Sequence, residues 1–461
     1  MNFKKIISIL LVTLIIIISF CGCSADSSAS SEINFDELFT SRDLENGYDE
    51  DETKYISLSD ETITINKEGV YVLSGAISDG QIIINADESA KIQLVLNGVT
   101  INSSSSAAIY IIEADKVFIT TAKETDNTLT TTGKFLSDGD INVDGVIFSK
   151  ADLTLNGQGT LNISTSYGNG IVSKDDLKLT SGAYNINVSK NGLEANDIIA
   201  IADGEYNIEA QNDALNSDED TAIIGGTLNI IAEDDGIHTS NELYVKGGKI
   251  NISQSYEGLE GKAIYISGGD IKLNASDDGL NAAGGNDSSG NEHTQFKDEF
   301  SAQEGVIIEI TGGNLYVNCE GDGIDSNGDL TISSGNIIVE GPQSSGNGAL
   351  DYNGEAEISG GTILAIGSSG MAMNFTEASQ GSILVNFSSS YSNETITITD
   401  SSSNVIYSFD STKTINSILF SSPDLKKGET YTITIGDQYQ TVTLTDYIYG
   451  SSSGMGMGMM R

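Results

Sequence analysis

The sequence is poor in cysteine, histidine, tryptophan and positive charge. Its 461 residues include three Cys, two His, no Trp and 22 basic side chains against 66 acidic ones, for a formal charge of −44. Arg is absent from position 43 through position 460. The negative field repels phosphate backbones and anionic lipid, so we expect no nucleic-acid partner. Beyond Cys23 only Cys319 remains, which excludes an internal disulfide framework and leaves packing or bound ions as sources of stability.

A four-residue motif returns at regular intervals through the middle of the chain. It consists of an acid or amide, usually Gly, then Ile or Leu, and a polar residue. Its copies begin at Asn191, Asp213, Asp235, Glu257, Asp278 and, after an insertion, Asp322. The intervals between these positions are 22, 22, 22, 21 and 44 residues. A unit of this length cannot bury its apolar face alone, so successive copies must stack into one core.

Short strands can be read within each repeat. Residues 243–245 and 250–252 place their aliphatic side chains on one face, and Gly248 lies in the turn between them, where positive φ is expected. Three short strands with three turns fit one period, so each strand lies beside its equivalent in the next coil. Right-handed crossovers between parallel strands are strongly preferred. The sequence therefore predicts an all-β fold, a right-handed parallel β-helix.

The pattern changes along the chain and predicts several segments. A β-helix is expected over 53–387, with regular coils from about 142, followed by a small C-terminal antiparallel β module over 388–449. Residues 24–52 are read as a polar tether with room for one short capping helix. The tail 450–461 is a low-complexity Ser/Gly/Met segment that we expect to be disordered. The chain is expected to be a monomer.

The N-terminus carries an export signal. Lys4 and Lys5 precede an apolar run over 6–20, which suits a signal peptide better than a bilayer span. Cys23 follows Gly22 and precedes a Ser/Asp-rich stretch, as the lipid-modified cysteine of bacterial lipoproteins does. We therefore expect a lipoprotein signal peptide and lipobox over 1–23, with a protein secreted and anchored to the outer face of the cell membrane only through lipid on Cys23. A simple cleaved signal is the alternative.

Outward-facing positions of the coils carry amides and tyrosines. Asn207, Asn229 and Asn251 occupy equivalent positions at 22-residue spacing. Stacked amides hydrogen-bond along a solenoid, which is a structural role, but they also form a flat polar face on which sugar hydroxyls can dock. Tyr244, Tyr265 and Tyr316 are also predicted to face outward, where they offer rings to sugars. The absence of Trp weakens this aromatic platform.

Acidic side chains recur at one phase of the repeat. Equivalent residues of adjacent coils lie about 4.8 Å apart, and two carboxylates near that distance repel by roughly 1 kcal/mol even in bulk water. A calcium ion takes six to eight oxygens, so stacked carboxylates can share one. Two clusters of candidate calcium ligands follow, formed by Asp213, Asp234, Asp235 and Glu257, and by Asp277, Asp278, Asp322 and Asp325. The alternative is a solvated acidic edge in which these residues serve only turn geometry.

Specific phrases of the chain carry a family resemblance. The segments 69–75 (GVYVLSG), 94–99 (LVLNGV), 107–110 (AAIY), 321–328 (GDGIDSNG) and 339–342 (VEGP) closely resemble clostridial-type β-helix proteins described as carbohydrate-binding domain-containing. The resemblance covers roughly 40–449. It implies an extracellular β-helix that binds calcium and plant-wall polysaccharides, including cellulose and acidic pectic chains. The resemblance carries over no ligand set beyond the acids named above.

The predicted fold is also similar to that of pectate lyases, which makes catalysis the main alternative. Such enzymes need calcium and a Lys or Arg base to remove a proton from a uronate. The gap in Arg excludes an Arg base, and Lys262 is the remaining candidate, although nearby carboxylates oppose its neutral form. The prediction is therefore a non-catalytic, calcium-stabilised polysaccharide-binding protein, which holds acidic chains through bridging cations. A Lys-based lyase and a structural surface adhesin are the alternatives.

Overall fold

The computed structural model describes residues 33–51, 53–137, 139, 142–282 and 301–450. The signal segment with Cys23, the insertion over 283–300 and the C-terminal tail lie outside these residues. Contacts divide the chain into two units, 1–38 and 39–461. No helix of the described residues is long and apolar enough to span a membrane. In the first unit, the described residues form a turn in which the Glu37 amide donates to the Asn34 carbonyl at 3.0 Å.

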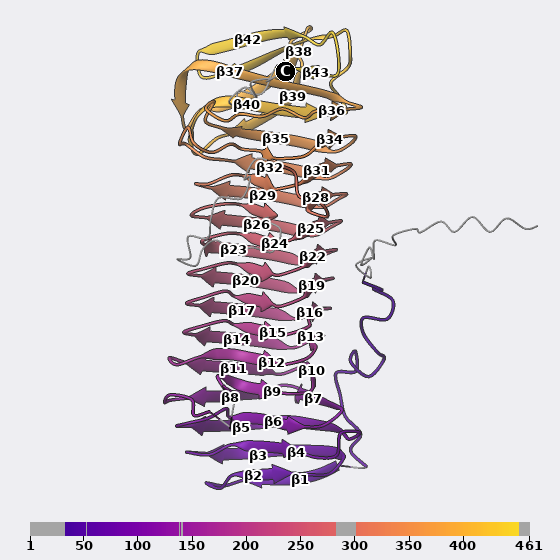
Figure 1. Cartoon of the computed structure of the whole chain (residues 1–461), viewed down its shortest axis with the longest axis vertical. Helices are drawn as coiled ribbons and strands as arrows, with labels where there is room; N and C mark the ends of the chain where they lie inside the picture. The colour runs from indigo at the N-terminus through magenta and orange to yellow at the C-terminus, as the bar shows by residue number, and fades with distance from the viewer. Residues whose placement is uncertain (1–32, 52, 138, 140–141, 283–300, 451–461) are drawn as a thin grey trace, which may run out of the picture. The chain divides into compact units, whose positions relative to one another are not determined.

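The second unit is a stack of β coils, each with strands on three faces (Figure 1). The described residues contain strands and turns but no helix. Strands of the first face are β7 (Lys116–Thr121), β10 (Asp152–Gly157), β13 (Leu177–Leu179), β16 (Ile198–Ile201), β19 (Asp220–Ile223), β22 (Glu242–Val245), β25 (Ala263–Ile266), β28 (Ile307–Ile310), β31 (Asp329–Ile332), β34 (Ala356–Ile358) and β36 (Glu377–Ala378).

The second face carries the longer strands and the third face the shorter ones. The second face consists of β8 (Asp126–Thr131), β11 (Thr160–Thr165), β14 (Ala183–Val188), β17 (Glu205–Ala210), β20 (Thr227–Ala232), β23 (Lys249–Ser255), β26 (Asp270–Ala275), β29 (Asn314–Cys319), β32 (Asn336–Glu340) and β35 (Thr362–Gly367). The third face consists of β2 (Ile63–Ile65), β4 (Ile82–Asn85), β6 (Ile109–Glu113), β9 (Gly145–Ser149), β12 (Asn169–Ser173), β15 (Leu193–Ala195), β18 (Leu215–Ser217), β21 (Ile237–Thr239), β24 (Leu259–Gly261), β27 (Leu280–Ala282), β30 (Ile324–Ser326) and β33 (Asp351–Tyr352).

The coils stack in parallel register, as the repeat predicts. Tyr184 pairs with Tyr206 and Ile186 with Ile208, so like residues lie above one another. The inward aliphatic side chains of all three faces join in one continuous buried core. The two tyrosine rings are buried within it and stack at 5.1 Å between centroids. Gly248 adopts the expected positive φ, 85°, and a side chain there would press on the backbone of the preceding coil.

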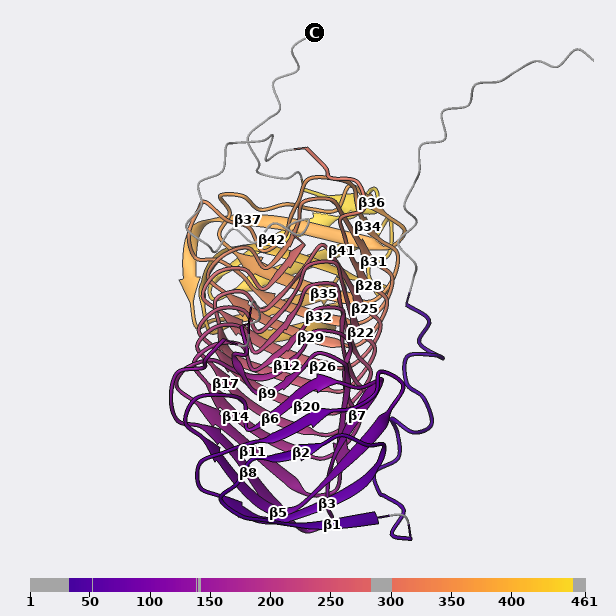
Figure 2. The same ribbon diagram turned by 60° about the horizontal axis from the view of Figure 1, so that its bottom comes forward.

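The first coils are less regular than the rest. The strands β1 (Thr53–Leu58), β3 (Gly69–Ile77) and β5 (Lys91–Ser103) form the end of the stack that comes forward in Figure 2. The long strand β5 continues around a corner, because its first half pairs with β7 and its second half with β8. The later coils divide this strand into two, one on each face. Parallel pairing begins with β1, which pairs with β3 from residue 53 onward.

A segment at the start of the second unit is fixed against the first face through Asp43. This fully buried carboxylate accepts hydrogen bonds from Lys116 Nζ at 2.7 Å and Thr154 Oγ1 at 2.6 Å. Burial opposes its ionisation, but these bonds outweigh burial and lower the pKa of Asp43 to about 2. Thr40 and Asp43 exchange side-chain to backbone bonds, as in a helix capping box. The predicted short helix is nevertheless absent from residues 33–51, because Asp43 is held by the coils.

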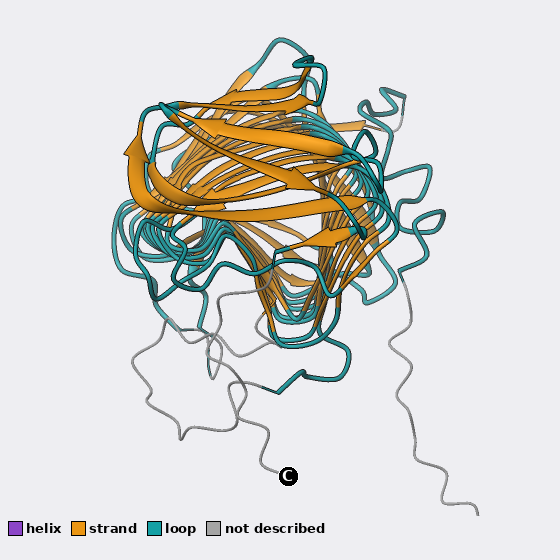
Figure 3. Cartoon of the chain, turned by 90° about the horizontal axis from the view of Figure 1, so that it is seen from above, coloured by secondary structure: helices purple, strands orange, loops and turns teal. Residues whose placement is uncertain are grey.

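A small antiparallel module closes the other end of the stack, as Figure 3 shows from above. Its sheet contains β38 (Thr395–Asp400), β39 (Val405–Asp410), β41 (Thr430–Ile435) and β42 (Gln438–Thr443). Three further strands extend the solenoid sheet, namely β37 (Gly381–Ser392), β40 (Thr414–Ser422) and β43 (Ile448–Tyr449). The outward residues Leu364 and Ile366 of β35 pack with Ile398 and Ile433 of the module in a second apolar cluster. The predicted all-β parallel β-helix with a small antiparallel module is confirmed.

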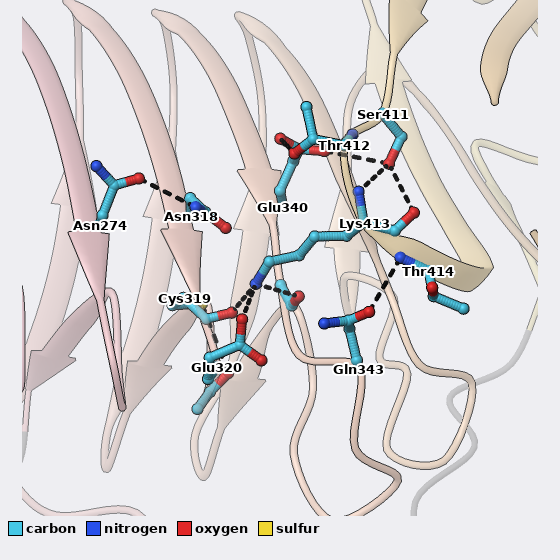
Figure 4. Close-up of polar contacts among 12 residues, drawn as sticks. Asn274, Asn318, Cys319, Glu320, Glu340, Gln343, Ser411, Thr412, Lys413 and Thr414 are labelled. Carbon is cyan, nitrogen blue, oxygen red and sulfur yellow. Dashed lines mark hydrogen bonds and ion pairs between the residues drawn. The ribbon is translucent and has the colours of Figure 1, made fainter. Parts of the chain in front are cut away.

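A buried carboxylate joins the loop before β40 to the last coils (Figure 4). Glu340, at the end of β32, is fully buried. It accepts hydrogen bonds from the Thr412 amide at 2.7 Å, the Thr412 hydroxyl at 3.0 Å, the Ser411 hydroxyl at 3.1 Å and the Tyr316 hydroxyl at 2.5 Å. All four donors would lose a charged partner without it, so Glu340 fixes the loop to the second face.

Lys413 makes a second set of contacts from the same loop (Figure 4). Its buried ammonium donates to the carbonyls of Cys319 and Gly341 and lies 3.1 Å from the Glu320 carboxylate. The module is thus held by apolar packing, strand pairing and two charged side chains.

Candidate functional site

Two rows of polar side chains run along one corner of the stack, where each coil enters its third-face strand. The first row consists of the motif residues Asn191, Asp213, Asp235, Glu257, Asp278 and Asp322. The second row consists of the outward residues of the third face, Glu194, Asn216, His238, Glu260, Asn281, Asp325 and Asp351. We call these two rows the acidic corner.

The first row has a structural role in the turns. Asp213 Oδ1 accepts the backbone amide of Asp235 at 3.1 Å, and Asp235 Oδ1 accepts that of Glu257 at 3.1 Å. Asp278 Oδ1 accepts the amide of Asp322 at 2.6 Å. Each bond joins one coil to the next, which explains the acid at the first position of these three motifs. In each of these three carboxylates, one oxygen therefore bonds the backbone of the next coil.

The structure brings most of the predicted calcium ligands together. Three groups at the acidic corner, one of which also includes the neighbouring Asp234, have carboxylate oxygens within 4.8 Å of one another. They are Asp213, Asp234 and Asp235; Asp235, Glu257 and Glu260; and Asp278, Asp322 and Asp325. Asp277 lies outside these groups and is hydrogen-bonded to the Tyr256 hydroxyl. Sequence reasoning missed Glu260 and Asp351, which share a register position with Asp325. This row could have been identified from the sequence, because it contains the fourth residue of each motif.

A further acidic group lies at the first face, apart from the acidic corner. Asp152, Asp175 and Asp176 have carboxylate oxygens within 4.8 Å of one another. Sequence reasoning missed this group because it lies outside the motif. The ammonium of Lys178 lies 3.0 Å from Asp176, so part of its charge is balanced within the chain.

Burial and mutual repulsion disfavour the charged forms of the acids in the corner. Burial first, and then the nearby carboxylates, raise the pKa of Asp213 and Asp278 to about 7 and that of Glu257 to about 9. Burial, joined by repulsion from Asp351, likewise raises the pKa of Asp322 to about 7 and that of Asp325 to about 8. Such groups are stable near neutral pH either as protonated acids or beside a cation.

The donors of the acidic corner fit a calcium ion. Asn281 is buried between Glu260 and Asp325 in the second row, and its Nδ2 donates to Glu257 Oε2 at 2.8 Å. Among the described residues, its Oδ1 is buried without a hydrogen-bond partner. An unpaired buried carbonyl oxygen among carboxylates is a ready ligand for a hard cation. Oxygen donors dominate the three groups, which favours calcium over zinc.

The predicted asparagine row forms a hydrogen-bonded ladder on the second face. Asn162 Oδ1 accepts from Asn185 Nδ2 at 2.9 Å, Asn185 from Asn207 at 3.0 Å, and Asn207 from Asn229 at 3.0 Å. These amides line a shallow groove of about 490 Å³ that follows the coils from β11 to β23. Asn251 continues the row in register, beyond the last ladder bond that the described residues show. The ladder prediction is confirmed, and the sugar-binding role of Asn207, Asn229 and Asn251 stays a prediction.

The three predicted tyrosines do not form one platform. Tyr244 and Tyr265 stack on the first face with centroids 4.9 Å apart, while Tyr316 lies on the second face. The expectation that Tyr244 is exposed is wrong. It retains 8 % exposure, because the ring of Tyr265 covers it on one side and its hydroxyl donates to Glu242. Tyr265 and Tyr316 are half-buried, and Tyr316 is the tyrosine that shares the second face with the ladder.

Lys262 lies in the turn between β24 and β25. Its backbone amide donates to the Asn241 carbonyl at 2.9 Å. Among the described residues, no ion pair joins its ammonium to a carboxylate of the acidic corner. His238, in the second row, places Nε2 3.5 Å from Glu260 Oε2. The contacts of Lys262 and His238 therefore do not provide the paired nucleophile and base that covalent catalysis needs.

Part of the chain matches a family of known proteins. Residues 59–295 fit the model of a family described as carbohydrate-binding domain-containing protein, and this match spans just over half of the chain. The chain belongs to this family. Its membership confirms the resemblance seen in the sequence phrases.

Two known proteins, one of them a solved structure, are similar to part of this chain. A carbohydrate-binding domain-containing protein of Acetivibrio thermocellus is 31% identical over 190 residues, which cover 40% of this chain and 64% of that protein. The chain thus spans slightly less than two thirds of the curated relative that it matches. A solved structure of the polysaccharide lyase-like protein from C. thermocellum, a gadolinium derivative, is 25% identical, with a TM-score of 0.40 over 58% of this chain and 94% of that one.

Proposed function

We propose that this family member is a non-catalytic, calcium-stabilised protein that binds plant-wall-type polysaccharides, either cellulose-like neutral chains or acidic pectic chains. The observation that carries the proposal is the asparagine ladder, which lines a groove along the second face with exposed amides. Within the ladder, an amide such as Asn207 donates one N–H and accepts at one oxygen lone pair, so its other N–H and its second lone pair remain for sugar hydroxyls. In this proposal the protein acts outside the cell, anchored by lipid on Cys23.

Calcium has a stabilising role in this proposal. The acidic corner would hold the ion through Asp278, Asp322, Asp325 and the Asn281 carbonyl oxygen, and a second ion near Asp235. Calcium supplies positive charge that keeps buried carboxylates ionised and joins successive coils. The ladder groove lies on the second face, whereas the acidic corner borders the third. The ion is therefore assigned to the scaffold and not to the sugar.

A lyase is the second candidate because pectate lyases combine calcium with a lysine base. Proton abstraction needs a neutral lysine within hydrogen-bond reach of a bound uronate. Lys262 is a weak candidate for this base, because no described contact places its ammonium at the carboxylates of the acidic corner. The surface adhesin, a third candidate, predicts no glycan binding.

Retention on immobilised polysaccharides separates these three candidates. We expect the full chain, in calcium, to be retained on neutral β-glucan or polygalacturonate without forming unsaturated uronates, which absorb ultraviolet light. Asn207→Ala with Asn229→Ala should weaken retention about 10-fold, because two sugar-facing amides are lost. Asn404→Ala, which removes an exposed amide bonded to Asp400 in the module, is the matched control. Product formation would establish a lyase, and absence of all retention would favour the adhesin.

A further inference from the structure

The groove of the second face changes its chemistry beyond the asparagine ladder. The ladder row continues in register from Asn229 through Asn251 and Lys272 to Tyr316. A neighbouring row places Lys249 beside Asp270. These side chains line a second shallow groove of about 460 Å³. The row thus passes from amides to a cation and an aromatic ring.

Two exposed lysines distinguish this groove from the rest of the chain. The chain has 22 basic side chains against 66 acidic ones, and most lysine contacts on its described surface are with acids. Among the described residues, neither Lys249 nor Lys272 takes part in an ion pair. The nearby carboxylate of Asp270 already accepts a hydrogen bond from Asn314 Nδ2 at 2.8 Å. Both ammonium groups are therefore available to an anion from solution.

The aromatic side of the groove is held in place. Lys272 Nζ lies 5.6 Å from the centroid of the Tyr316 ring. The Tyr316 hydroxyl donates to the fully buried Glu340, which the loop of the module fixes in turn. A ring fixed in this way can contact a sugar with little further loss of side-chain freedom. The cation and the ring lie on neighbouring coils, so one sugar unit can reach both.

We propose that Lys249 and Lys272 form a subsite for a carboxylate-bearing sugar and bind its carboxylate directly, beside the Tyr316 ring and the Asn251 amide. The inference rests on the proposed polysaccharide-binding function, selects the acidic chains among the ligands named there and adds a mode of recognition. It also revises the expectation that a chain of charge −44 holds acidic polysaccharides only through bridging cations. Two lysines outnumber the single carboxylate, Asp270, among the residues that line this groove, so its net positive charge favours direct contact.

The test uses calorimetric titration of the full chain with polygalacturonate in EDTA. We expect wild type to bind the polymer without calcium, and Lys249→Gln with Lys272→Gln to weaken that binding at least about 10-fold, since two charge-assisted contacts are lost. Fully methyl-esterified polygalacturonate keeps the same sugar but no charge, and its binding should be equal in both proteins. Lys123→Gln with Lys134→Gln removes the same charge at exposed positions outside the groove and should leave binding unchanged.

The outcomes separate this inference from the proposed function. Equal binding of charged polymer by wild type and the Lys249/Lys272 variant would overturn the subsite and leave polysaccharide binding in place. An equal loss in the Lys123/Lys134 control would also overturn it, because net charge would then explain the effect. If wild type binds neither charged nor neutral polysaccharide, the proposed function itself fails. A melting curve of each variant in calcium verifies that it is folded.

Discussion

In the motifs that begin with Asp, one oxygen of that side chain accepts a backbone amide of the next coil. Asp213 places Oδ1 on the Asp235 amide and Oδ2 on Asn216 Nδ2 at 2.8 Å. An amide suffices for the first bond, as Asn169 shows with the Asn191 amide at 3.0 Å. The acids in the later coils therefore go beyond what the turn requires, and the proposed calcium would account for the excess.

Glu340 gives a test at the scale of one residue. Glu340→Ala removes the acceptor of four hydrogen bonds and leaves the Thr412 amide and the buried donors near it without a charged partner. We expect the free energy of unfolding to fall by about 3 kcal/mol. Urea denaturation followed by circular dichroism measures this.

The control for the Glu340 variant is a substitution of Glu320, the solvent-facing carboxylate that pairs with Lys413. Glu320 is 55% exposed, so Glu320→Ala should cost less than about 1 kcal/mol. Equal stabilities for the two variants would show that the loop is held by apolar packing and not by the buried carboxylate.

The row of acids along the corner predicts how stability depends on pH. Asp213 and Asp278 have pKa values raised from 3.8 to about 7, so between these values the folded chain holds protons that the unfolded chain has released. The folded state therefore loses stability as pH rises through this window, by about 1.4 kcal/mol per pH unit for each such proton. In EDTA we expect a lower melting temperature at pH 8 than at pH 5, and calcium should reverse the loss at pH 8.

Scanning calorimetry at both pH values, with EDTA and with calcium, measures this dependence. Asp325→Asn removes a carboxyl group whose pKa is about 8 and should flatten the EDTA profile, whereas Asp218→Asn, at an exposed turn, should not. A chain in EDTA that is as stable at pH 8 as at pH 5 would contradict the role given to these acids.

At the level of strands, periodicity in the sequence predicts the contacts that recur in every coil. It does not predict contacts that occur in one coil only. The asparagine ladder follows from a 22-residue spacing, because parallel coils place such residues above one another. The cover of Tyr244 by Tyr265 and Glu242 depends on the local packing of two coils and leaves no periodic signal. Glu260 was missed because its register position holds Asn216 and His238 in the preceding coils.

At the scale of the second unit, the coils place different chemistry on different faces. Each residue keeps its direction from coil to coil, so acids gather at one corner, amides and lysines follow the second face, and aliphatic side chains stay inside. We therefore expect a mutation in one row to affect only the property proposed for that row. This separation permits the ladder variants, the lysine variants and the corner variants to be interpreted independently.

The contacts of the last coil with the C-terminal module predict that the module caps the stack. Ending the chain after Ala378 removes β40, leaves the edge of β35 unpaired and uncovers Leu364 and Ile366. An open apolar edge strand is a template for pairing with another chain, so we expect the truncated protein to self-associate in light scattering after gel filtration. Leu364→Lys with Ile366→Lys in the same truncated chain should restore the monomer, because charges on an edge strand oppose pairing. A truncated chain that stays monomeric without these lysines would show that the coils need no cap.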